Sequence, residues 1–211
     1  MIKGIIFDFG GVIVSDPSLH LNQRVAKIFA INPKLLTKIY RGQNLKKFER
    51  GLINAQIFRN NLKKQIQKQT KRKVSSEQIK LFEKTLTDQF LPYPHFLHYV
   101  HSLKKHYRIA LLTNNIPTFM CIWYHRFQLK KIFPIIITSF KTGMRKPDPA
   151  IYQYTCQKIR LKPKECLFID DQAKNIAGAR KTGLQTIQFT TEKVTISAIK
   201  RKLKESGNVL K

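Results

Sequence analysis

The stretch IIFDFGGVIV, residues 5–14, places a carboxylate at the end of a run of apolar residues that is typical of a buried strand. Asp8 ends the apolar run, and Gly10 and Gly11 clear side chains from the space beside it. A buried carboxylate costs free energy unless a cation or hydrogen bonds compensate its charge. We therefore interpret Asp8 as a functional group rather than as a simple strand-end cap.

Four further segments are similar to this first strand, because each is a short run rich in Ile, Leu or Phe that closes on a polar or small residue. They are YRIALLTN (107–114), IFPIIITSF (132–140), CLFIDD (166–171) and LQTIQF (184–189). Helical stretches separate them: residues 117–132 and 149–161 each begin with a proline, and residues 173–183 end with a glycine. This alternation predicts an α/β fold, a doubly wound and mostly parallel Rossmann-like sheet with helices on both faces.

Residues 16–92 interrupt the alternation, because their pattern is helical and polar and contains no strand of comparable quality. We expect this segment to form a helical cap inserted after the first strand. Residues 1–15 and 93–211 then form the α/β core. The segment LPYPHF (91–96) contains two prolines, which indicates a hinge back to the core.

The composition indicates a soluble protein. Of the 211 residues 42% are hydrophobic, which is enough for a packed core. Three scattered cysteines favour reduced packing residues over a disulfide framework, so we expect a cytoplasmic location. No small-residue cleavage site follows the first apolar stretch, and no apolar run approaches the ~20 residues that a membrane span requires.

The net charge is the unusual feature, because 40 Lys and Arg residues outnumber 12 Asp and Glu residues and give a formal charge of +28. Such a field attracts anions, whether phosphorylated metabolites, nucleic acid or an acidic membrane surface. We favour a solvated lysine-rich surface, because the basic segments lack the interleaved aromatic residues of a single-strand binder. Nucleic acid is therefore an alternative partner that we do not favour, and no oligomeric state follows from the sequence.

Polar residues follow several of the predicted strands at the point where each strand ends. Asp8, Thr113 and Asp171, the second residue of the strand-ending pair Asp170-Asp171, should meet in one crevice, because ligand sites of open parallel sheets lie at the carboxyl ends of the strands. The loop that carries Lys146 can reach this crevice. Clustered carboxylates repel, and a divalent cation keeps them ionised; oxygen ligands without His or Cys suit Mg²⁺. A lysine and a hydroxyl beside these carboxylates can form a binding site for a phosphoryl group, and an Asp can act as nucleophile.

These motifs resemble the haloacid dehalogenase-like hydrolase superfamily, in the subfamily IA phosphatase-like branch with a helical C1 cap after the first motif. The resemblance covers nearly the whole chain. IIFDFGGVIV resembles the first motif, which implies that Asp8 is the nucleophile and a metal ligand. LLTNN (111–115) resembles the second motif, which implies that Thr113 binds the substrate phosphate. We also assign Asn114 and Gly11 to substrate binding.

The third and fourth motifs complete the resemblance. TGMRKPDPAIY (142–152) implies that Lys146 is the catalytic lysine that neutralises the phosphate. CLFIDDQAKNIAGARKTGLQTIQF (166–189) implies that Asp171 is a direct metal ligand and that Asp170 supports the metal site. Asn175 stands where a further Asp is frequent, which removes one charge from this site.

Gly10 departs from the family pattern. The family offers the backbone carbonyl of this residue to Mg²⁺, and its side chain is usually a second Asp that protonates the leaving group. Gly10 keeps the carbonyl and loses the acid, so we expect a phosphatase that uses a substitute acid or favours easy leaving groups such as anomeric sugar phosphates. Asp16 and His20 are the candidates for a substitute, although we favour their interpretation as residues that open the first cap helix.

The sequence therefore predicts a Mg²⁺-dependent phosphatase that hydrolyses a small phosphorylated metabolite, with a sugar phosphate as one candidate, through an aspartyl-phosphate on Asp8. Arg41, Lys47 and Arg50 lie in the cap, where the family selects its substrates, and a basic surface explains them equally well. Two alternatives are a metal-independent dehalogenase-type hydrolase, which retention of Asp170 and Asp171 disfavours, and a non-catalytic relative that binds an anionic partner.

Overall fold

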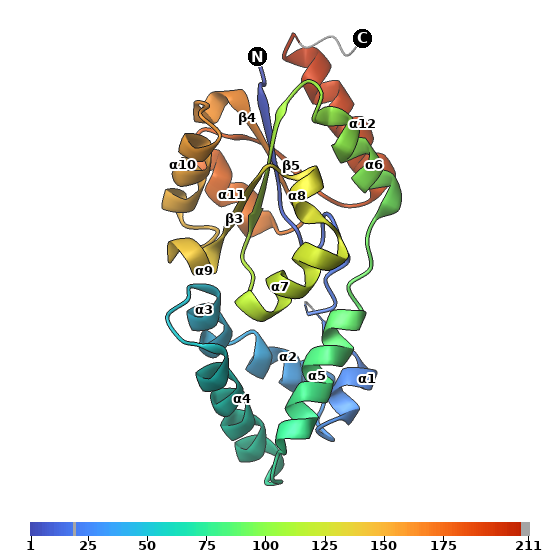
Figure 1. Ribbon diagram of the computed structural model, residues 1–211, viewed down its shortest axis with the longest axis vertical. Coiled ribbons are helices and arrows are strands. Elements are labelled where there is room, and N and C mark those ends of the chain that lie inside the picture. The colour runs from blue at the N-terminus through green and yellow to red at the C-terminus, as the bar shows by residue number, and fades with distance from the viewer. Residues whose placement is uncertain (19, 208–211) are drawn as a thin grey trace.

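A five-stranded parallel sheet forms the centre of the computed structural model, which describes residues 1–18 and 20–207 (Figure 1). The spatial order of the strands is β3-β2-β1-β4-β5, and every neighbouring pair is parallel. All five predicted strands are found, and the predicted doubly wound parallel sheet is confirmed. The strands are β1 Gly4–Phe7, β2 Arg108–Thr113, β3 Ile135–Thr138, β4 Cys166–Asp170 and β5 Gln185–Gln188.

β1 is the central strand, and all four of its residues are buried. Its last residue, Phe7, is in register with Leu111 of β2 and with Ile169 of β4. β1 ends at Phe7, whereas β2 continues to Thr113 and β4 continues to Asp170, so the three strands end within two residues of one another in register. This register brings the carboxyl ends of three strands to one edge, where a ligand site is expected.

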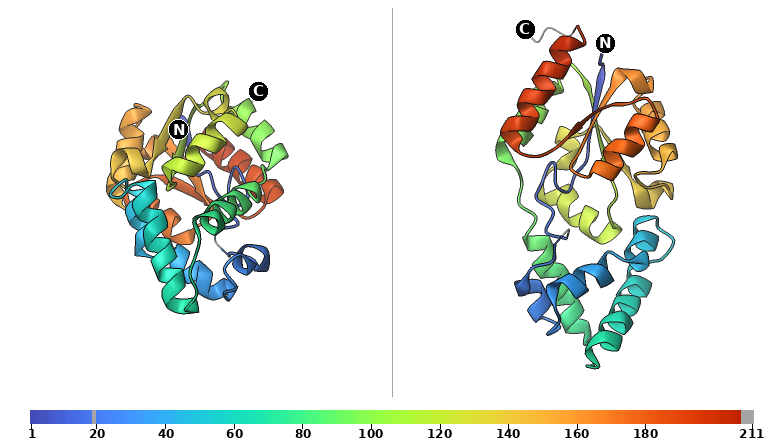
Figure 2. Two further views of the ribbon diagram at one scale, coloured as in Figure 1. Left: turned by 60° about the horizontal axis from the view of Figure 1, so that its bottom comes forward. Right: turned by 180° about the vertical axis from the view of Figure 1, so that it is seen from behind.

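Helices cover both faces of the sheet, as Figures 1 and 2 show. Alternation along β1 separates the faces, because Ile5 and Phe7 belong to one hydrophobic cluster and Ile6 to the other. The first face is covered by α6 Pro94–Leu103, α7 Pro117–Arg126, α8 Leu129–Ile132 and α12 Glu192–Glu205. The second is covered by α10 Pro149–Lys158 and α11 Ala173–Lys181. Short turns, α9 Ser139–Thr142 and the 3₁₀ turn Pro163–Glu165, follow β3 and precede β4.

The predicted helix over residues 117–132 is wrong as a single element, because the chain breaks between α7 and α8. Gln128 adopts a left-handed conformation with φ of 46°. The break redirects the chain so that Leu129 and Phe133 turn into the core, where both are fully buried. Burial of two large apolar side chains outweighs the local cost of the left-handed residue.

Five helices lie beyond the carboxyl edge of the sheet, at the bottom of Figure 1. They are α1 Gln23–Lys27, α2 Pro33–Tyr40, α3 Gln43–Glu49, α4 Ala55–Thr70 and α5 Ser76–Asp88. Asn, Gly or Ser residues precede these helices, and four of the five accept a hydrogen bond from the first turn. In its described part, the segment 16–92 contains these helices and no strand beyond an isolated bridge at Pro92.

The two connections between the sheet and these helices run side by side. The Ser15 N–H donates to the Leu91 carbonyl at 2.8 Å, and the Tyr93 N–H donates to the Ile13 carbonyl at 3.1 Å. The prediction that a cap begins at residue 16 and ends at residue 92 is compatible with this pairing, and the boundary itself stays a prediction. Among the described helices, none combines the length and the apolar composition that crossing a bilayer demands.

Candidate active site

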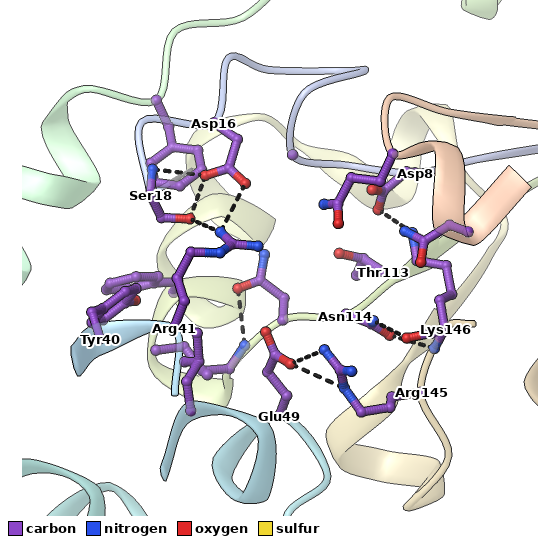
Figure 3. A pocket seen from close by; sticks show the side chains of 18 of the residues that line it. Asp8, Asp16, Ser18, Tyr40, Arg41, Glu49, Thr113, Asn114, Arg145 and Lys146 are labelled. Carbon is purple, nitrogen blue, oxygen red and sulfur yellow. Dashed lines mark hydrogen bonds and ion pairs between the residues drawn. The ribbon is translucent and has the colours of Figure 1, made fainter. Parts of the chain in front are cut away.

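A polar pocket lies between the carboxyl edge of the sheet and the helices of segment 16–92 (Figure 3). Asp8, Gly10 and Thr113 reach it from the ends of β1 and β2. The opposite wall comes from the helical segment, and it includes Arg41 and Glu49. Residues that are far apart in the sequence therefore meet in one cavity.

Lys146 lines the pocket, and its ammonium group lies between the carboxylates of Asp8 and Asp170. Its Nζ lies 2.7 Å from Asp8 Oδ1 and 2.6 Å from Asp170 Oδ2, and its side chain is fully buried. Burial opposes the lysine charge, but Asp170 and Asp8 outweigh it and raise the pKa of Lys146. Burial raises the pKa of Asp8 well above its ordinary value, Lys146 opposes this rise, and Asp170 and Asp171 add to it. The cluster therefore favours a cation beside its carboxylates.

The two aspartates at the end of β4 differ in how they are bonded. Both oxygens of Asp170 are used: Oδ1 accepts from the Gln172 N–H at 2.8 Å, and Asn175 Nδ2 donates to both oxygens at 3.0 Å. The Asn175 side chain therefore holds the Asp170 carboxylate in place. Asp171 Oδ1 is buried, and among the described residues it has no hydrogen-bond partner. The oxygen that is open to a further ligand belongs to Asp171.

A divalent metal ion fits these carboxylates. Asp8, Asp170 and Asp171 each place an oxygen within 4.8 Å of the others. Burial and the neighbouring Asp170 raise the pKa of Asp171 to about 6. An unpartnered buried oxygen in an all-oxygen donor set is the chemistry that Mg²⁺ accepts. The cluster could therefore bind a metal ion.

The residues assigned to substrate binding have three different environments. Thr113 is buried and, in Figure 3, its side chain points into the pocket. Asn114 lines the pocket, but its amide donates to the Lys146 carbonyl and accepts from the Lys146 N–H, both at 2.8 Å. This reciprocal pair positions Lys146. Contact of Asn114 with the substrate stays a prediction.

Gly11 lies beside the pocket rather than in its described lining. Its φ is 83°, and a Cβ at this residue would lie 2.6 Å from the Asp171 carboxylate. Both facts require glycine, because the backbone is left-handed and the Asp171 side chain occupies the space. The structure thus explains Gly11 through its backbone, and a substrate contact stays a prediction.

The interpretation of Asp16 and His20 as helix-opening residues is wrong, because Asn22 caps α1. Asp16 lines the pocket, and its Oδ1 accepts from both the N–H and the hydroxyl of Ser18. His20 is exposed and lies outside the pocket lining. Only one of the two candidate acids therefore reaches the site.

An ion pair across the pocket was not predicted from the sequence. Arg145 donates to Glu49 Oε2 through Nη2 at 2.6 Å and through Nε at 3.1 Å, which connects α3 to the loop that carries Lys146 (Figure 3). The signal that could have found it is a rare acidic residue, Glu49, in a strongly basic segment. Of the three cap cations singled out, Arg41 lines the pocket, whereas Lys47 and Arg50 are exposed and do not.

Comparison with known proteins adds a family match. The model of the haloacid dehalogenase-like hydrolase family matches residues 2–183. The D-ribitol-5-phosphate phosphatase of Bacteroides thetaiotaomicron is 28% identical over 201 residues, which cover 89% of this chain and 92% of that protein.

Solved structures share the same fold. A predicted HAD-like family hydrolase from Porphyromonas gingivalis is 27% identical with a TM-score of 0.75, and the match covers 97% of this chain and 98% of that one. A HAD-family enzyme of Bacteroides thetaiotaomicron, in complex with magnesium and inorganic phosphate, is 23% identical with a TM-score of 0.71. That match covers 90% of this chain and 95% of the other, and at this identity it shows the fold alone.

Proposed function

This chain belongs to the haloacid dehalogenase-like hydrolase family, and we propose that it is a Mg²⁺-dependent phosphatase that hydrolyses a small phosphorylated metabolite. The observation that carries the proposal is the buried Lys146 ammonium, which lies within 2.7 Å of both Asp8 and Asp170 at the floor of the pocket. A fixed cation beside a carboxyl group at the end of a strand suits attack on a negatively charged phosphoryl group.

Asp8 is the nucleophile in this proposal. Lys146 and the Phe9 N–H, at 2.7 Å, both hold Asp8 Oδ1, so the orientation of the carboxylate is fixed before substrate arrives. A bond forms between Asp8 and phosphorus while the bond from phosphorus to the leaving oxygen breaks. Water then attacks phosphorus, which releases inorganic phosphate and regenerates Asp8.

The remaining residues assist in binding and in charge stabilisation. Lys146 offsets negative charge on the phosphoryl oxygens, Thr113 offers a hydroxyl to them, and Asn114 holds the Lys146 backbone in place. Asp8, the Gly10 carbonyl and Asp171 would hold Mg²⁺, with Asp170 in support. The bound ion would supply Lewis-acid stabilisation of the developing charge.

The wall of the pocket opposite Asp8 indicates the substrate class. Ser18, Arg41 and Glu49 lie on this wall beside the apolar Tyr40 and Leu45, and the core residues Arg145 and Lys174 add further charge to the pocket lining. Hydroxyl groups satisfy such a wall better than an alkyl chain does, because a buried polar group without a partner is costly. A sugar or polyol phosphate fits this chemistry, and the D-ribitol-5-phosphate phosphatase that is 28% identical supports the same class.

A screen of phosphorylated metabolites, with D-ribitol 5-phosphate and a sugar 1-phosphate among them, tests the proposal with and without Mg²⁺. The Asp8→Asn variant should lose at least about 10⁴-fold in kcat. Its fold should be retained, because Lys146 keeps its ion pair with Asp170. The matched control is Asp88→Asn, which changes an exposed carboxylate on α5.

Three results would contradict the proposal. Undiminished phosphatase activity in Asp8→Asn would remove the nucleophile from the mechanism. Halide release from 2-haloacids without metal, in the absence of phosphatase activity, would establish the dehalogenase alternative, and inactivity on both substrate classes would favour the non-catalytic alternative.

A further inference from the structure

The backbone at Gly10 does not require glycine. Its φ lies outside the left-handed region, unlike that of Gly11. The three atoms nearest to a Cβ built at Gly10 all belong to Asp16: its Cβ, Cγ and Oδ2, each at 3.5 Å, which is ordinary van der Waals contact. Position 10 therefore has room for a small side chain, and what a longer one would meet is the Asp16 carboxylate.

The Asp16 carboxylate lines the same pocket as Asp8 and Gly10, and its side chain is only 12% exposed. Figure 3 shows the Asp16 and Asp8 side chains at the upper side of the pocket, apart from one another. Asp16 thus lies within van der Waals distance of the point where a side chain at position 10 would begin.

The two oxygens of Asp16 have different partners. Oδ1 accepts from the Ser18 N–H at 2.9 Å and from the Ser18 hydroxyl, so the carboxylate is held by a local turn. Arg41 Nη1 donates to that same hydroxyl at 3.1 Å and lies 4.0 Å from Asp16 Oδ2. Oδ2 therefore has one neighbouring cation at the limit of an ion pair and is available to a ligand in the pocket.

The other carboxyl groups in the described lining of the pocket are already used. Asp8 is held by Lys146 as the nucleophile, and Glu49 is held by two nitrogens of Arg145. Expulsion of an alkoxide from phosphorus benefits from a proton donor within reach of the leaving oxygen. Asp16 is the carboxyl group in this lining that is free to perform this transfer.

We propose that Asp16 is the general acid and base of the reaction, in place of a carboxylate at position 10. The inference rests on the proposed phosphatase function. In the first step the Asp16 carboxyl group gives its proton to the leaving oxygen as the bond to phosphorus breaks and the bond to Asp8 forms. In the second step the Asp16 carboxylate takes a proton from the attacking water, and Asp8 and inorganic phosphate are released.

The test compares two phosphate esters that differ in their need for an acid. D-ribitol 5-phosphate expels an alkoxide, whereas 4-nitrophenyl phosphate expels a stable phenolate. Asp16→Asn should lower kcat/KM for the first ester about 10²–10⁴-fold and for the second by less than about tenfold, because only the first needs the proton. Asp88→Asn serves as the matched control and should change neither value.

A burst experiment examines the second step. Because Asp16→Asn also lacks the base, its aspartyl-phosphate should accumulate, so 4-nitrophenyl phosphate should give a burst of one equivalent of nitrophenol before a slow steady rate. The swap variant, Gly10→Asp with Asp16→Ala, moves the carboxylate to position 10 and empties the space it needs. It should regain at least tenfold in kcat/KM for the alkyl ester relative to Asp16→Ala alone.

Three outcomes would overturn the assignment of Asp16. These are equal losses in kcat/KM for both esters, unchanged kinetics in Asp16→Asn, or a swap variant that folds and binds inorganic phosphate like the wild type without any regain. Failure of the phosphatase function itself looks different, because the wild-type protein would then hydrolyse neither ester.

Discussion

Asp170 and Asp171 are neighbours in sequence, yet only one of them has an oxygen left for a new ligand. Three donors saturate Asp170, whereas Asp171 Oδ1 is buried without a partner among the described residues. The free-energy cost of burying this oxygen without a hydrogen-bond partner is lowest when Asp171 is protonated or when a cation binds the carboxylate. Its protonation should therefore compete with metal binding.

This competition predicts how Mg²⁺ stabilises the protein at different pH values. The pKa of Asp171 is raised from an ordinary value of 3.8 to about 6 by burial and by Asp170. Without metal, its favourable contribution to the free energy of unfolding is complete below about pH 4 and is lost as the pH rises through about 6. Mg²⁺ binds the ionised form, so it should raise the melting temperature clearly at pH 7.5 and little at pH 5.

Thermal melts with and without Mg²⁺ at both pH values measure this effect. In Asp171→Asn the Mg²⁺-dependent rise should be small at either pH, because the open carboxylate is gone. A wild-type rise that is the same at pH 5 and pH 7.5 would show that Asp171 does not control metal binding.

The position of a site residue could be predicted from the sequence where the residue follows a strand. It could not be predicted where tertiary packing brings a loop against a distant helix. Asp8, Thr113 and Asp170 could be placed together because strand ends of a parallel sheet converge. Glu49 and Arg145 are 96 residues apart, and only the docking of α3 on the loop before Lys146 brings them within 2.6 Å. Asp16 was ambiguous, because the turn that aims it at the pocket depends on its bonds to Ser18.

Helix α11 packs closely against the loop that carries Lys146. A Cβ at Gly178, in the middle of this helix, would lie 2.6 Å from the Pro147 carbonyl oxygen and 2.8 Å from the Pro147 Cβ. The helix and the loop are therefore in backbone contact next to Lys146. Glycine is present because of this close approach rather than because of any turn.

Replacement of Gly178 by Ala should reverse the usual effect of this substitution. In an open helix, Gly→Ala stabilises by about 1 kcal/mol. Here overpacking should outweigh that gain and destabilise by about 1–3 kcal/mol, and displacement of Pro147 should lower kcat as well. Urea denaturation and steady-state kinetics measure the two effects, and a stabilised, fully active variant would contradict the close packing of α11.

Elements with a strong apolar pattern were predictable, and elements shaped by tertiary packing were not. Strands β1 to β4 carry runs of apolar residues, and Gly183, with φ of 88°, follows α11 where a terminal glycine was expected. The break between α7 and α8 has no such local signal. It depends on the space that the core offers to Leu129 and Phe133.

The whole molecule carries far more positive than negative charge, and its carboxylates are largely engaged. Ion pairs use eight acidic side chains of the described residues, among them Asp8, Asp16 and Glu49 in the pocket. These pairs use seven of the 40 Lys and Arg residues, so most of the basic residues that the structure describes have no ion-pair partner. This excess should attract polyanions without selecting a sequence.

Binding to duplex DNA should accordingly be weak and strongly salt-dependent. If six or more phosphates are contacted, a rise from 50 to 200 mM salt should reduce affinity about 10³-fold or more, since binding rests on counterion release. Fluorescence anisotropy with two unrelated duplexes measures this. Tight binding that distinguishes the duplexes at physiological salt would instead support a nucleic-acid-binding role.

The position of β1 in the sheet affects how the protein is made on the ribosome. This central strand is synthesised first, but its neighbours, β2 and β4, begin only at Arg108 and Cys166. At a translation rate of about 5–20 residues per second, roughly 5–20 s pass before β2 emerges. Throughout this interval Ile5, Ile6 and Phe7 have no strand to pair with, so the nascent chain has to shield them by chaperone binding or by transient collapse onto the helices of segment 16–92.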